Sequence, residues 1–428
     1  MWFSFNQNMY QIPRGTRDFT TEEMQKRRYL EDSLRTTFQT FGYKEIQTPM
    51  FETLELFTAK SGEGIIEEIY SFKDKGGRDL ALRPELTAPV IRFYIDKLQM
   101  EPKPLKLFYF GNCFRYDRPQ KGRYREFMQA GCEIIGADTP EAYAELIAMA
   151  YSLLKNVGLK DVKLNIGNLN ILSSLFETLK ISKDEQKQLI PLIDKSQFDE
   201  VLTLLQNFGV GKKIANEFLE ILQSSDIKKI TKIIEKDESA KKELSYLEKI
   251  LNLLEKSFNI KNYQIKMSIV RGLDYYKGIV FEIDAPALGA EKQLCGGGAY
   301  ELVSLFGGKE TPTAGFAIGF DRTILALETE KYPFPSTTIK VYVVPVNEET
   351  IDKSIEIAQN LRKQGISTDI DLLRRGIGKS LKYASSISAE KAILVGPREL
   401  EQGSVTIRDM KTGEQETVKL NEIQNRLN

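Results

Sequence analysis

The sequence predicts an α+β protein in which an antiparallel sheet is interrupted by a helical insertion and followed by a separate α/β domain. Strand-like segments joined by polar loops occupy residues 80–135 and resume near residue 261, whereas residues 170–258 are rich in Lys, Glu, Leu and Ile with helical spacing. A proline-containing segment, KYPFPSTT at 331–338, then precedes a strand–helix–strand rhythm. The predicted domains are 1–168 and 261–332 (two parts of one sheet domain), 169–260 (the insertion) and 338–428 (the C-terminal domain).

Composition limits the classes of protein to consider. The chain has 428 residues, of which 60 are Lys or Arg, 60 are Asp or Glu and 41% are hydrophobic, as in an ordinary globular protein of two to four domains. This charge balance predicts that any nucleic-acid binding depends on local basic patches. Three widely spaced cysteines and no histidine exclude a Cys/His zinc site and favour a reducing, cytoplasmic setting. Because no signal peptide and no apolar run of about 20 residues is present, we expect no membrane segment.

The first long element is a helix predicted over residues 20–42. One of the two threonines at its start can cap it, the two glutamates that follow suit its positive end, and Gly42 can end it. The next segment, YKEIQTPMFE at 43–52, is predicted as a strand that Pro49 interrupts. Because proline removes a ladder donor, we expect Pro49 at a sheet edge, a strand end or a subunit contact.

Strands joined by charged turns are predicted next. LALRPELTAPVIRFY (80–94), LKLFYFGNCFRYDR (105–118) and YREFMQAGCEIIG (124–136) have strand composition, and the polar loops between them favour antiparallel pairing. A helix is predicted at 139–157. Strands return after the insertion, from YQIKMSIV to GFAIGFDR, which leads into a helix that begins near Phe320. In the C-terminal domain the predicted order is strand, helix, strand, short helix, strand and two further strands.

A cluster of arginines surrounds the turn in FRYDRPQKGRYREF. Spread over two predicted strands and their loop, these arginines suit bidentate binding of phosphate oxygens and stacking on a purine. The alternative is the solvated tip of a hairpin. Arg115 argues against that alternative, because it lies within an apolar run where a charge needs a partner or a ligand. The arginines are Arg115, Arg118, Arg123 and Arg125.

Three other segments suggest contacts with a small molecule. Glu85 and Thr87 are expected on the same face of a strand, where a carboxylate and a hydroxyl can hold an ammonium group; a purely structural ion pair of Glu85 is equally compatible. The glycines of CGGGAY at 295–300 either allow a close backbone approach or form a tight turn between strands. Arg322 lies in the first turn of a predicted helix, which is unfavourable for a cation unless an anion binds there.

Polar side chains also occur on segments that we expect to be buried in the sheet. They either satisfy one another's hydrogen bonds or line a small polar pocket. They belong to Gln129, Glu133, Tyr275 and Tyr276, the tyrosines being part of RGLDYYKGIVFEI. A basic cluster in the C-terminal domain is either a solvated helix face or a nucleic-acid contact. Its members are Arg374, Arg375, Lys379 and Lys382.

Taken together, these segments resemble a known family. TPMFE with its preceding helix, FRYDRPQKGRYREF and GFAIGFDR are similar to motifs 1, 2 and 3 of class II aminoacyl-tRNA synthetases, in the same order along the chain. RGLDYYKGIVFE and LCGGGAY resemble the two segments that mark histidyl-tRNA synthetases within that class. The resemblance extends from IPRGTRDF to the C-terminal domain, which is similar to the family's anticodon-binding domain. It implies ATP with Mg²⁺, L-histidine and tRNA-His as ligands, and a homodimer.

The resemblance also implies a reaction. The histidine carboxylate attacks the α-phosphate of ATP, and the histidyl-adenylate then acylates the tRNA. Because a carboxylate is already ionised at neutral pH, the first step needs alignment and charge neutralisation rather than a base. Arg115 and Arg271 would hold the α-phosphate from two sides as the catalytic residues, with Arg271 where other class II enzymes have a metal ion. The implied ATP-binding residues are Arg115, Asp117, Arg123, Arg125, Phe127 and Arg322.

Histidine would be recognised at both ends of the molecule. Glu133 and Tyr276 would face the two imidazole nitrogens, and such a site rejects apolar side chains because its own polar groups would be left unpaired. The implied histidine-binding residues are Glu85, Thr87 and Gln129 for the α-amino group, Arg271 for the carboxylate, and Glu133, Tyr276 and its neighbour Tyr275 for the side chain.

Further contacts and departures concern the tRNA and the glycine-rich segment. Arg118 and Gln120 in the motif 2 turn would meet the acceptor end of the tRNA, with the C-terminal basic cluster as a second candidate contact. The family usually continues Arg-Tyr-Asp-Gly after the glycines, whereas this chain has AYEL at 299–302, and Lys277 replaces a small polar residue.

The alternative function is a non-catalytic paralogue such as the regulatory subunit of ATP phosphoribosyltransferase. Such proteins usually lack the C-terminal domain, RGLDYY and the motif 2 arginines, all present here. A synthetase for another amino acid is disfavoured by Glu133 together with RGLDYY.

Overall fold

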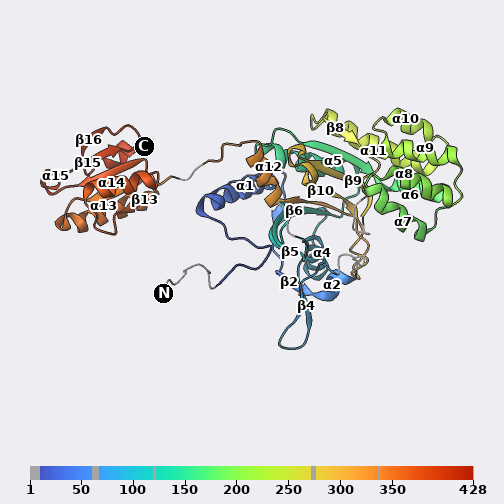
Figure 1. Cartoon of the computed structure of the whole chain (residues 1–428), viewed down its shortest axis with the longest axis horizontal. Helices are drawn as coiled ribbons and strands as arrows, with labels where there is room; N and C mark the ends of the chain where they lie inside the picture. Colours follow the sequence, from blue (N-terminus) through green and yellow to red (C-terminus); the bar gives the residue numbers. More distant parts are fainter. Residues whose placement is uncertain (1–9, 60–66, 119–121, 271–275, 336–337, 428) are drawn as a thin grey trace, which may run out of the picture. The chain divides into compact units, whose positions relative to one another are not determined.

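The computed structural model contains two compact units, Met1–Phe334 and Pro335–Asn428 (Figure 1). No helix within the described part of the chain is long and apolar enough to cross a membrane. The residues that the structure describes are 10–59, 67–118, 122–270, 276–335 and 338–427.

An eight-stranded sheet forms the centre of the first unit. Its order is β1-β5-β6-β11-β10-β9-β7-β8, in which the six central strands pair antiparallel and the edge strands β1 and β8 join in parallel. The predicted antiparallel sheet is therefore confirmed. The strands are β1 (Lys44–Glu45), β5 (Leu105–Phe114), β6 (Glu126–Ile135), β7 (Lys163–Asn168), β8 (Tyr263–Ile265), β9 (Tyr276–Asp284), β10 (Gln293–Tyr300) and β11 (Thr313–Gly319).

The glycines of CGGGAY lie inside β10, in the middle of this sheet, so a tight turn at this position was the wrong prediction. Glycine normally weakens a strand, and its presence in a central strand marks a close approach of another group. Here the group is the neighbouring strand β11. A Cβ atom on Gly297 would overlap the carbonyl oxygen of Gly315 and the Cβ atom of Phe316.

Three helices pack on one face of the sheet, and the hydrophobic core lies between them and the strands. The first begins as predicted, with a capping box in which the Thr20 hydroxyl and the Glu23 carboxylate bond to each other's backbone N–H. Its apolar side is fully buried, and Phe38 stacks on Phe108 of β5 with ring centroids 4.9 Å apart. The three helices are α1 (Thr21–Thr40), α5 (Pro140–Asn156) and α12 (Phe320–Thr329).

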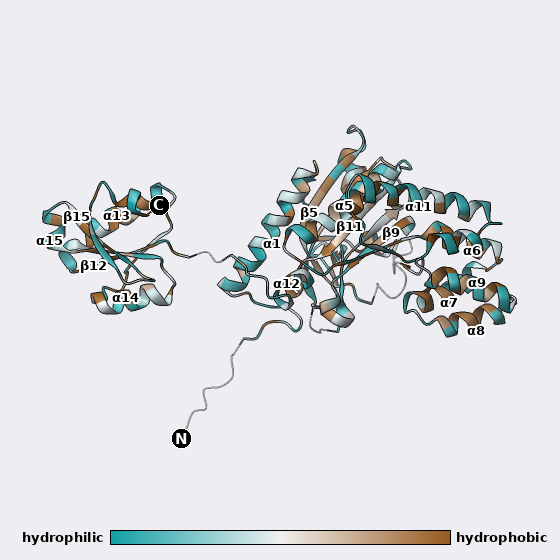
Figure 2. Cartoon of the chain, turned by 90° about the horizontal axis from the view of Figure 1, so that it is seen from above, coloured by the Kyte–Doolittle hydropathy of each residue, from teal (hydrophilic) through white to brown (hydrophobic). Residues whose placement is uncertain are grey.

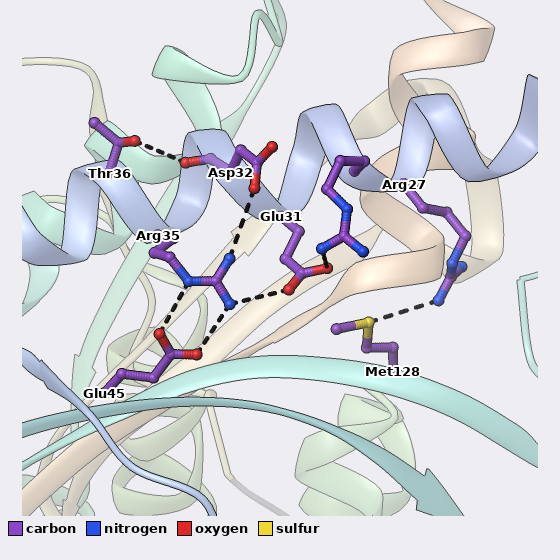
Figure 3. Close-up of polar contacts among 8 residues, drawn as sticks. Arg27, Glu31, Asp32, Arg35, Thr36, Glu45 and Met128 are labelled. Carbon is purple, nitrogen blue, oxygen red and sulfur yellow. Dashed lines mark hydrogen bonds and ion pairs between the residues drawn. The ribbon is translucent and has the colours of Figure 1, made fainter. Parts of the chain in front are cut away.

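Charged side chains fasten α1 to the edge of the sheet, as Figure 3 shows. Arg35 donates through Nε and Nη2 to the two carboxylate oxygens of Glu45, both at 2.9 Å, and through Nη2 to Glu31 at 3.0 Å. Nearer the start of the helix, Arg27 Nη2 lies 3.6 Å from the sulfur of Met128 on β6. The helix is thereby held over both β1 and β6.

The prediction of a strand over residues 80–94 was wrong beyond β4. The Glu85 carboxylate accepts hydrogen bonds from the backbone N–H groups of Thr87 at 2.6 Å and Ala88 at 3.1 Å, which starts helix α4. Pro89 lies in the first turn, where its missing N–H has no intrahelical partner to lose. The elements here are β2 (Phe51–Thr53), β3 (Ser71–Lys73) and β4 (Asp79–Leu82) in the order β2-β4-β3, with α2 (Leu54–Thr58), α4 (Thr87–Phe93) and the π-helical turn η1 (Tyr94–Leu98).

Six helices intervene between β7 and β8, and they are the helical insertion expected from the sequence. Because β7 and β8 pair directly, the sheet is continuous although the sequence is not. The insertion helices show both teal and brown faces in Figure 2, as amphipathic helices with a buried apolar stripe do. The helices are α6 (Leu169–Thr178), α7 (Lys183–Asp194), α8 (Phe198–Asn207), α9 (Lys212–Gln223), α10 (Ile227–Ile233) and α11 (Glu238–Lys256).

The second unit is an α/β domain whose strands and two longer helices follow the predicted order; the short helices α15 and α16 were not predicted. Its five-stranded sheet has the order β13-β12-β14-β15-β16, with parallel pairs around β12 and antiparallel pairs beyond β14. Its elements are β12 (Val341–Pro345), α13 (Ile351–Lys363), β13 (Thr368–Ile370), α14 (Ile377–Ser386), β14 (Lys391–Val395), α15 (Pro397–Glu401), β15 (Ser404–Asp409), β16 (Gln415–Lys419) and α16 (Ile423–Leu427). Two short 3₁₀ helices also occur: η2 (Pro286–Glu291) in the first unit and η3 (Glu348–Thr350) in the second.

The close approach at Gly297 predicts a stability effect. Gly297→Ala should lower the apparent Tm by several degrees, because overpacking a core costs about 1–3 kcal/mol. Gly378→Ala in α14 is the control, since a Cβ atom there meets nothing within 4 Å; it should leave the Tm unchanged or slightly higher. Thermal unfolding followed by circular dichroism measures both. Equal Tm values for Gly297→Ala and the parent would contradict the steric explanation.

Candidate active site

A cavity of about 250 Å³ opens on the large sheet. Its walls come from β6, β10 and β11, the start of α12, the hairpin after β5 and the segment that leads into α4. Segments far apart in the sequence therefore meet at one site. The predicted site residues that line the cavity are Glu85, Thr87, Arg115, Asp117, Arg123, Phe127, Gln129, Glu133, Tyr276 and Arg322.

Other predicted site residues lie elsewhere. Arg125 is outside the cavity lining: its Nε donates to the carbonyl oxygen of Asp117 at 3.1 Å, and its guanidinium lies 3.9 Å from the centroid of the Tyr116 ring. It supports the hairpin from outside the cavity. Arg118 is exposed on the same hairpin. Three further predicted residues, Gln120, Arg271 and Tyr275, lie outside the described residues.

Glu133 lies at the buried end of the cavity, on β6, with 1% of its surface exposed. Its Oε1 accepts a hydrogen bond from the Tyr109 hydroxyl at 2.9 Å, and its Oε2 accepts one from the Tyr300 hydroxyl at 2.6 Å. Burial raises the pKa of Glu133 to about 8, against the opposing effect of these two hydrogen bonds. Gly315 on β11 leaves room for the carboxylate, because a Cβ atom there would overlap Oε2.

This arrangement suits a small polar ring. Tyr276 at the start of β9 also lines the cavity, and its ring meets that of Tyr300 edge to face, with centroids 6.4 Å apart. A carboxylate is an acceptor, whereas a phenol can both donate and accept. Glu133 and Tyr276 therefore offer complementary hydrogen-bonding groups to a heterocycle that has one N–H and one bare nitrogen.

Tyr109 and Tyr300 were missed as site residues. Tyr300 was noted only within the divergent glycine-rich segment, and Tyr109 was read as part of an apolar strand. The signal lies in the strand register, because Leu107 pairs with Glu133 and Tyr109 is two residues further along the same face of β5. A buried glutamate opposite an alternating strand predicts a hydroxyl donor on that face, but only once the register is known.

A second polar group of the cavity is formed by Glu85, Thr87 and Gln129. Contrary to the prediction, Glu85 and Thr87 do not share a strand; they lie at the start of α4, where the Glu85 carboxylate accepts the Thr87 N–H. The Thr87 hydroxyl reaches Glu133 and lowers its pKa, while the Glu85 charge raises it. The Gln129 amide oxygen accepts from the Cys113 thiol at 3.3 Å. Glu85, Thr87 and the end of the cavity are thus electrostatically linked.

Arg115 lines the cavity directly after β5. Its Nε donates to the Pro84 carbonyl oxygen at 2.9 Å, and its guanidinium carbon lies 5.3 Å from the centroid of the Phe127 ring. These contacts fix one edge of the guanidinium and one face of the ring. A planar cation beside an aromatic face suits a ligand that combines an anion with a flat base.

Two more arginines bring positive charge to the same cavity. Burial lowers the pKa of Arg322, the charges of Arg123 and Arg115 act in the same direction, and the Glu291 carboxylate acts against them. Arg322 pairs with Glu291 and also donates to the Gly122 carbonyl at 3.2 Å. Because three cations repel one another here, a bound polyanion would be favoured.

Two more charged residues line the cavity: Arg123 and the acidic residue Asp321. Arg123 pairs with Asp117. Asp321 directly precedes Arg322 in GFDR. It was not predicted as a site residue, yet it lines the cavity and is 8% exposed. It accepts from Arg17 at 2.7 Å and from Arg27 at 2.5 Å. Asp321 thereby joins the chain before α1 to the first turn of α12.

The predicted basic cluster of the second unit has mixed surroundings. Arg375 pairs with the buried Asp371 at 2.6 Å and stacks 4.2 Å from the Tyr383 ring centroid, so part of its role is structural. Arg374 pairs with Glu348 at 2.8 Å on the surface. The two lysines of the cluster, Lys379 and Lys382, are exposed on α14.

The fold is that of a class II aminoacyl-tRNA synthetase, with an antiparallel catalytic sheet and a separate α/β unit. Within this class, the chain belongs to the histidyl-tRNA synthetase family. The family model described as histidyl-tRNA synthetase matches residues 15–323, and the model described as anticodon binding domain matches residues 340–428.

Individual relatives agree over nearly the whole chain. The chain is 45% identical to the histidine–tRNA ligase of Methanocaldococcus jannaschii, with 97% of this chain and 99% of that protein covered. It is 44% identical to the histidine–tRNA ligase of Methanosarcina acetivorans, with 96% and 97% covered. The crystal structure of apo S. aureus histidyl-tRNA synthetase matches with a TM-score of 0.74 at 31% identity, and the match covers 98% of this chain and 100% of that chain.

The raised pKa of Glu133 predicts an unusual pH dependence of stability. The group favours folding most below its ordinary carboxyl pKa of 4.5, and this contribution is lost as the pH rises through the folded-state pKa of about 8. Glu133→Gln removes the titration. The free energy of unfolding of this variant, relative to the parent, should therefore rise between pH 5 and pH 8, by on the order of a few kcal/mol. Urea unfolding across this range measures the difference, and a pH-independent difference would show that Glu133 is ionised throughout.

Proposed function

We propose that this protein is a histidine–tRNA ligase, which joins L-histidine to tRNA-His through a histidyl-adenylate and releases AMP and pyrophosphate. The observation that carries the proposal is a single cavity that contains both Glu133, held by two tyrosine hydroxyls, and three arginines. The near full-length similarity to histidine–tRNA ligases supports it.

In the first step, the histidine carboxylate attacks the α-phosphorus of ATP and pyrophosphate leaves. The attacking oxygen is already ionised at neutral pH, so the protein contributes alignment and positive charge. Arg115 would bind the α-phosphate on one side. By the family resemblance, Arg271 would hold the opposite side and also contact the histidine carboxylate; this role stays a prediction.

Histidine would enter with its ring toward Glu133. The carboxylate accepts the imidazole N–H, and the Tyr276 hydroxyl donates to the other ring nitrogen. Glu85, Thr87 and Gln129 would bind the α-amino group from the adjoining wall of the cavity. An apolar side chain in this place would leave Glu133 and Tyr276 unpaired, which is the basis of discrimination without an editing reaction.

ATP would occupy the wall that carries the arginines. Phe127 would stack on adenine, while Arg123 and Arg322 would exchange part of their contacts with carboxylates for phosphate oxygens. Mg²⁺ would accompany ATP, spreading the negative charge of the phosphates and bound mainly by their oxygens.

The remaining assignments concern the macromolecular partners. Arg118 and Gln120 would contact the acceptor end of tRNA-His. In the second unit, Arg374 and the exposed Lys379 and Lys382 would form a further contact with the tRNA. We also propose a homodimer and a cytoplasmic location, both from the family resemblance. The alternative, a non-catalytic regulatory paralogue, is less well supported, because this chain retains the motif 2 arginines and the anticodon-binding domain.

The activity can be tested by pyrophosphate exchange. Purified protein with ATP and Mg²⁺ should exchange labelled pyrophosphate into ATP only when L-histidine is supplied, because only this side chain pairs with both Glu133 and Tyr276. Each of the other amino acids serves as a control. Absence of exchange with histidine would contradict the proposed activity and favour a non-catalytic role.

The imidazole contact can be tested separately. Glu133→Gln should raise the KM for histidine by roughly 10- to 100-fold, the equivalent of about 1.5–3 kcal/mol for a hydrogen bond to a charged group. The KM for ATP should stay unchanged. Glu328→Gln is a matched control, because this residue lies on the outer part of α12, where it pairs with Lys26. An unchanged histidine KM in Glu133→Gln would mean that the imidazole binds elsewhere.

A further inference from the structure

Arg83 is a buried cation next to the segment that carries Glu85. It is 2% exposed and lies between β4 and α4. Its guanidinium donates to main-chain carbonyls on two sides: Nε to Asn112 at 2.7 Å, and Nη1 to Thr48 at 2.8 Å and Pro49 at 3.0 Å. Burial lowers the pKa of Arg83, but an arginine side chain stays charged in proteins, so these dipoles must stabilise a full positive charge.

The main chain of Arg83 joins the same segments. Its N–H donates to the Met50 carbonyl at 3.0 Å, and its carbonyl accepts from the Phe114 N–H at 2.9 Å. On β5, Gly111 leaves space for the guanidinium, because a Cβ atom there would overlap Nη2 and lie 3.0 Å from Cζ. Arg83 therefore connects residues 48–50, strand β5 and the segment before α4 at one point.

This junction holds two groups of the cavity. The carbonyl of Pro84, the next residue, accepts from Arg115 Nε at 2.9 Å. The residue after that is Glu85, whose carboxylate is fixed by the Thr87 N–H at 2.6 Å. The phosphate-binding cation and the ammonium-binding carboxylate are thus attached to Arg83 through one or two residues.

We propose that Arg83 is a positioning residue for adenylation, which fixes the spacing between Arg115 and Glu85 and so aligns the histidine carboxylate with the α-phosphate. This inference rests on the proposed function. Arg83 does not line the cavity, so it acts through its neighbours. Because a small misplacement of reacting groups slows the chemical step more than it weakens nucleotide binding, its loss should lower kcat with little effect on the KM for ATP.

Arg83→Lys tests this role while keeping the charge. A single ammonium group cannot span the carbonyls of Asn112 and Thr48 as the guanidinium fork does. In histidine-dependent pyrophosphate exchange, we expect kcat to fall about 10- to 100-fold and the KM for histidine to rise, with the KM for ATP within about twofold of the parent. Arg78→Lys is the matched control, because Arg78 forms an exposed ion pair with Asp74 near β4.

A double-mutant cycle separates positioning from general loosening of the fold. Gly111→Ala pushes on the guanidinium from the β5 side, so it should reproduce the kinetic pattern of Arg83→Lys. In the Arg83→Lys background, Gly111→Ala should add only a small effect. Lysine has no group at the Nη2 position, which leaves the milder contact of the new Cβ atom with Leu86 Cδ2 at 3.2 Å. The two effects on kcat should therefore be strongly non-additive.

The outcomes distinguish this inference from the proposed function. A parent protein without histidine-dependent exchange would overturn the function itself. With an active parent, a near-normal kcat in Arg83→Lys, a parallel rise in the KM for ATP, or additive effects in the cycle would overturn the positioning role. If Arg83→Lys does not fold, Gly111→Ala alone decides: a normal kcat in that variant overturns the role.

Discussion

The structure depends on burying one carboxyl group, that of Glu133, in the middle of an antiparallel sheet. Glu133 on β6 is supported from three other strands of the same sheet: Tyr109 comes from β5, Tyr300 from β10, and Gly315 on β11 leaves the space that the carboxylate fills. Each of these contacts requires the register that the strands have. A slip of one residue would turn the supporting side chain to the other face of the sheet, so the fold and the pocket are specified together.

The burial of Glu133 also determines what the pocket can select. With a pKa of about 8, the Glu133 carboxyl group is mostly neutral near neutral pH. A ligand that donates an N–H to this group stabilises its ionised form, whereas an apolar ligand leaves the group neutral and forms no hydrogen bond with it. In the proposed function, selection and stability are therefore opposed at Glu133, because the burial that would make the carboxyl group discriminating also makes its charge unfavourable.

Much of the fold could be predicted because its signals are local. The capping box at Thr20 and Glu23 needs only four residues of sequence, and the change from strand composition to Lys/Glu/Leu/Ile spacing marks the insertion. The failures involve partners distant in sequence. Gly297 of β10 is explained by Phe316 on β11, and the role of Tyr109 depends on the pairing of β5 with β6. The start of α4 is a different case, since Glu85 provides a local cap that strand-like composition concealed.

The chain has no histidine, and its cavity relies on ionisable groups held in position by other parts of the fold. Two buried ionisable groups show how this is done. Glu133 is held by tyrosine hydroxyls and Arg83 by backbone carbonyls, so in both cases the partners are neutral dipoles; all of them except the Thr48 carbonyl lie on strands. An opposite charge would stabilise either group more strongly, but for Glu133 it would also satisfy the hydrogen-bonding capacity that a ligand must use. Neutral partners hold the geometry of the site and leave part of the hydrogen-bonding capacity of Glu133 for a ligand.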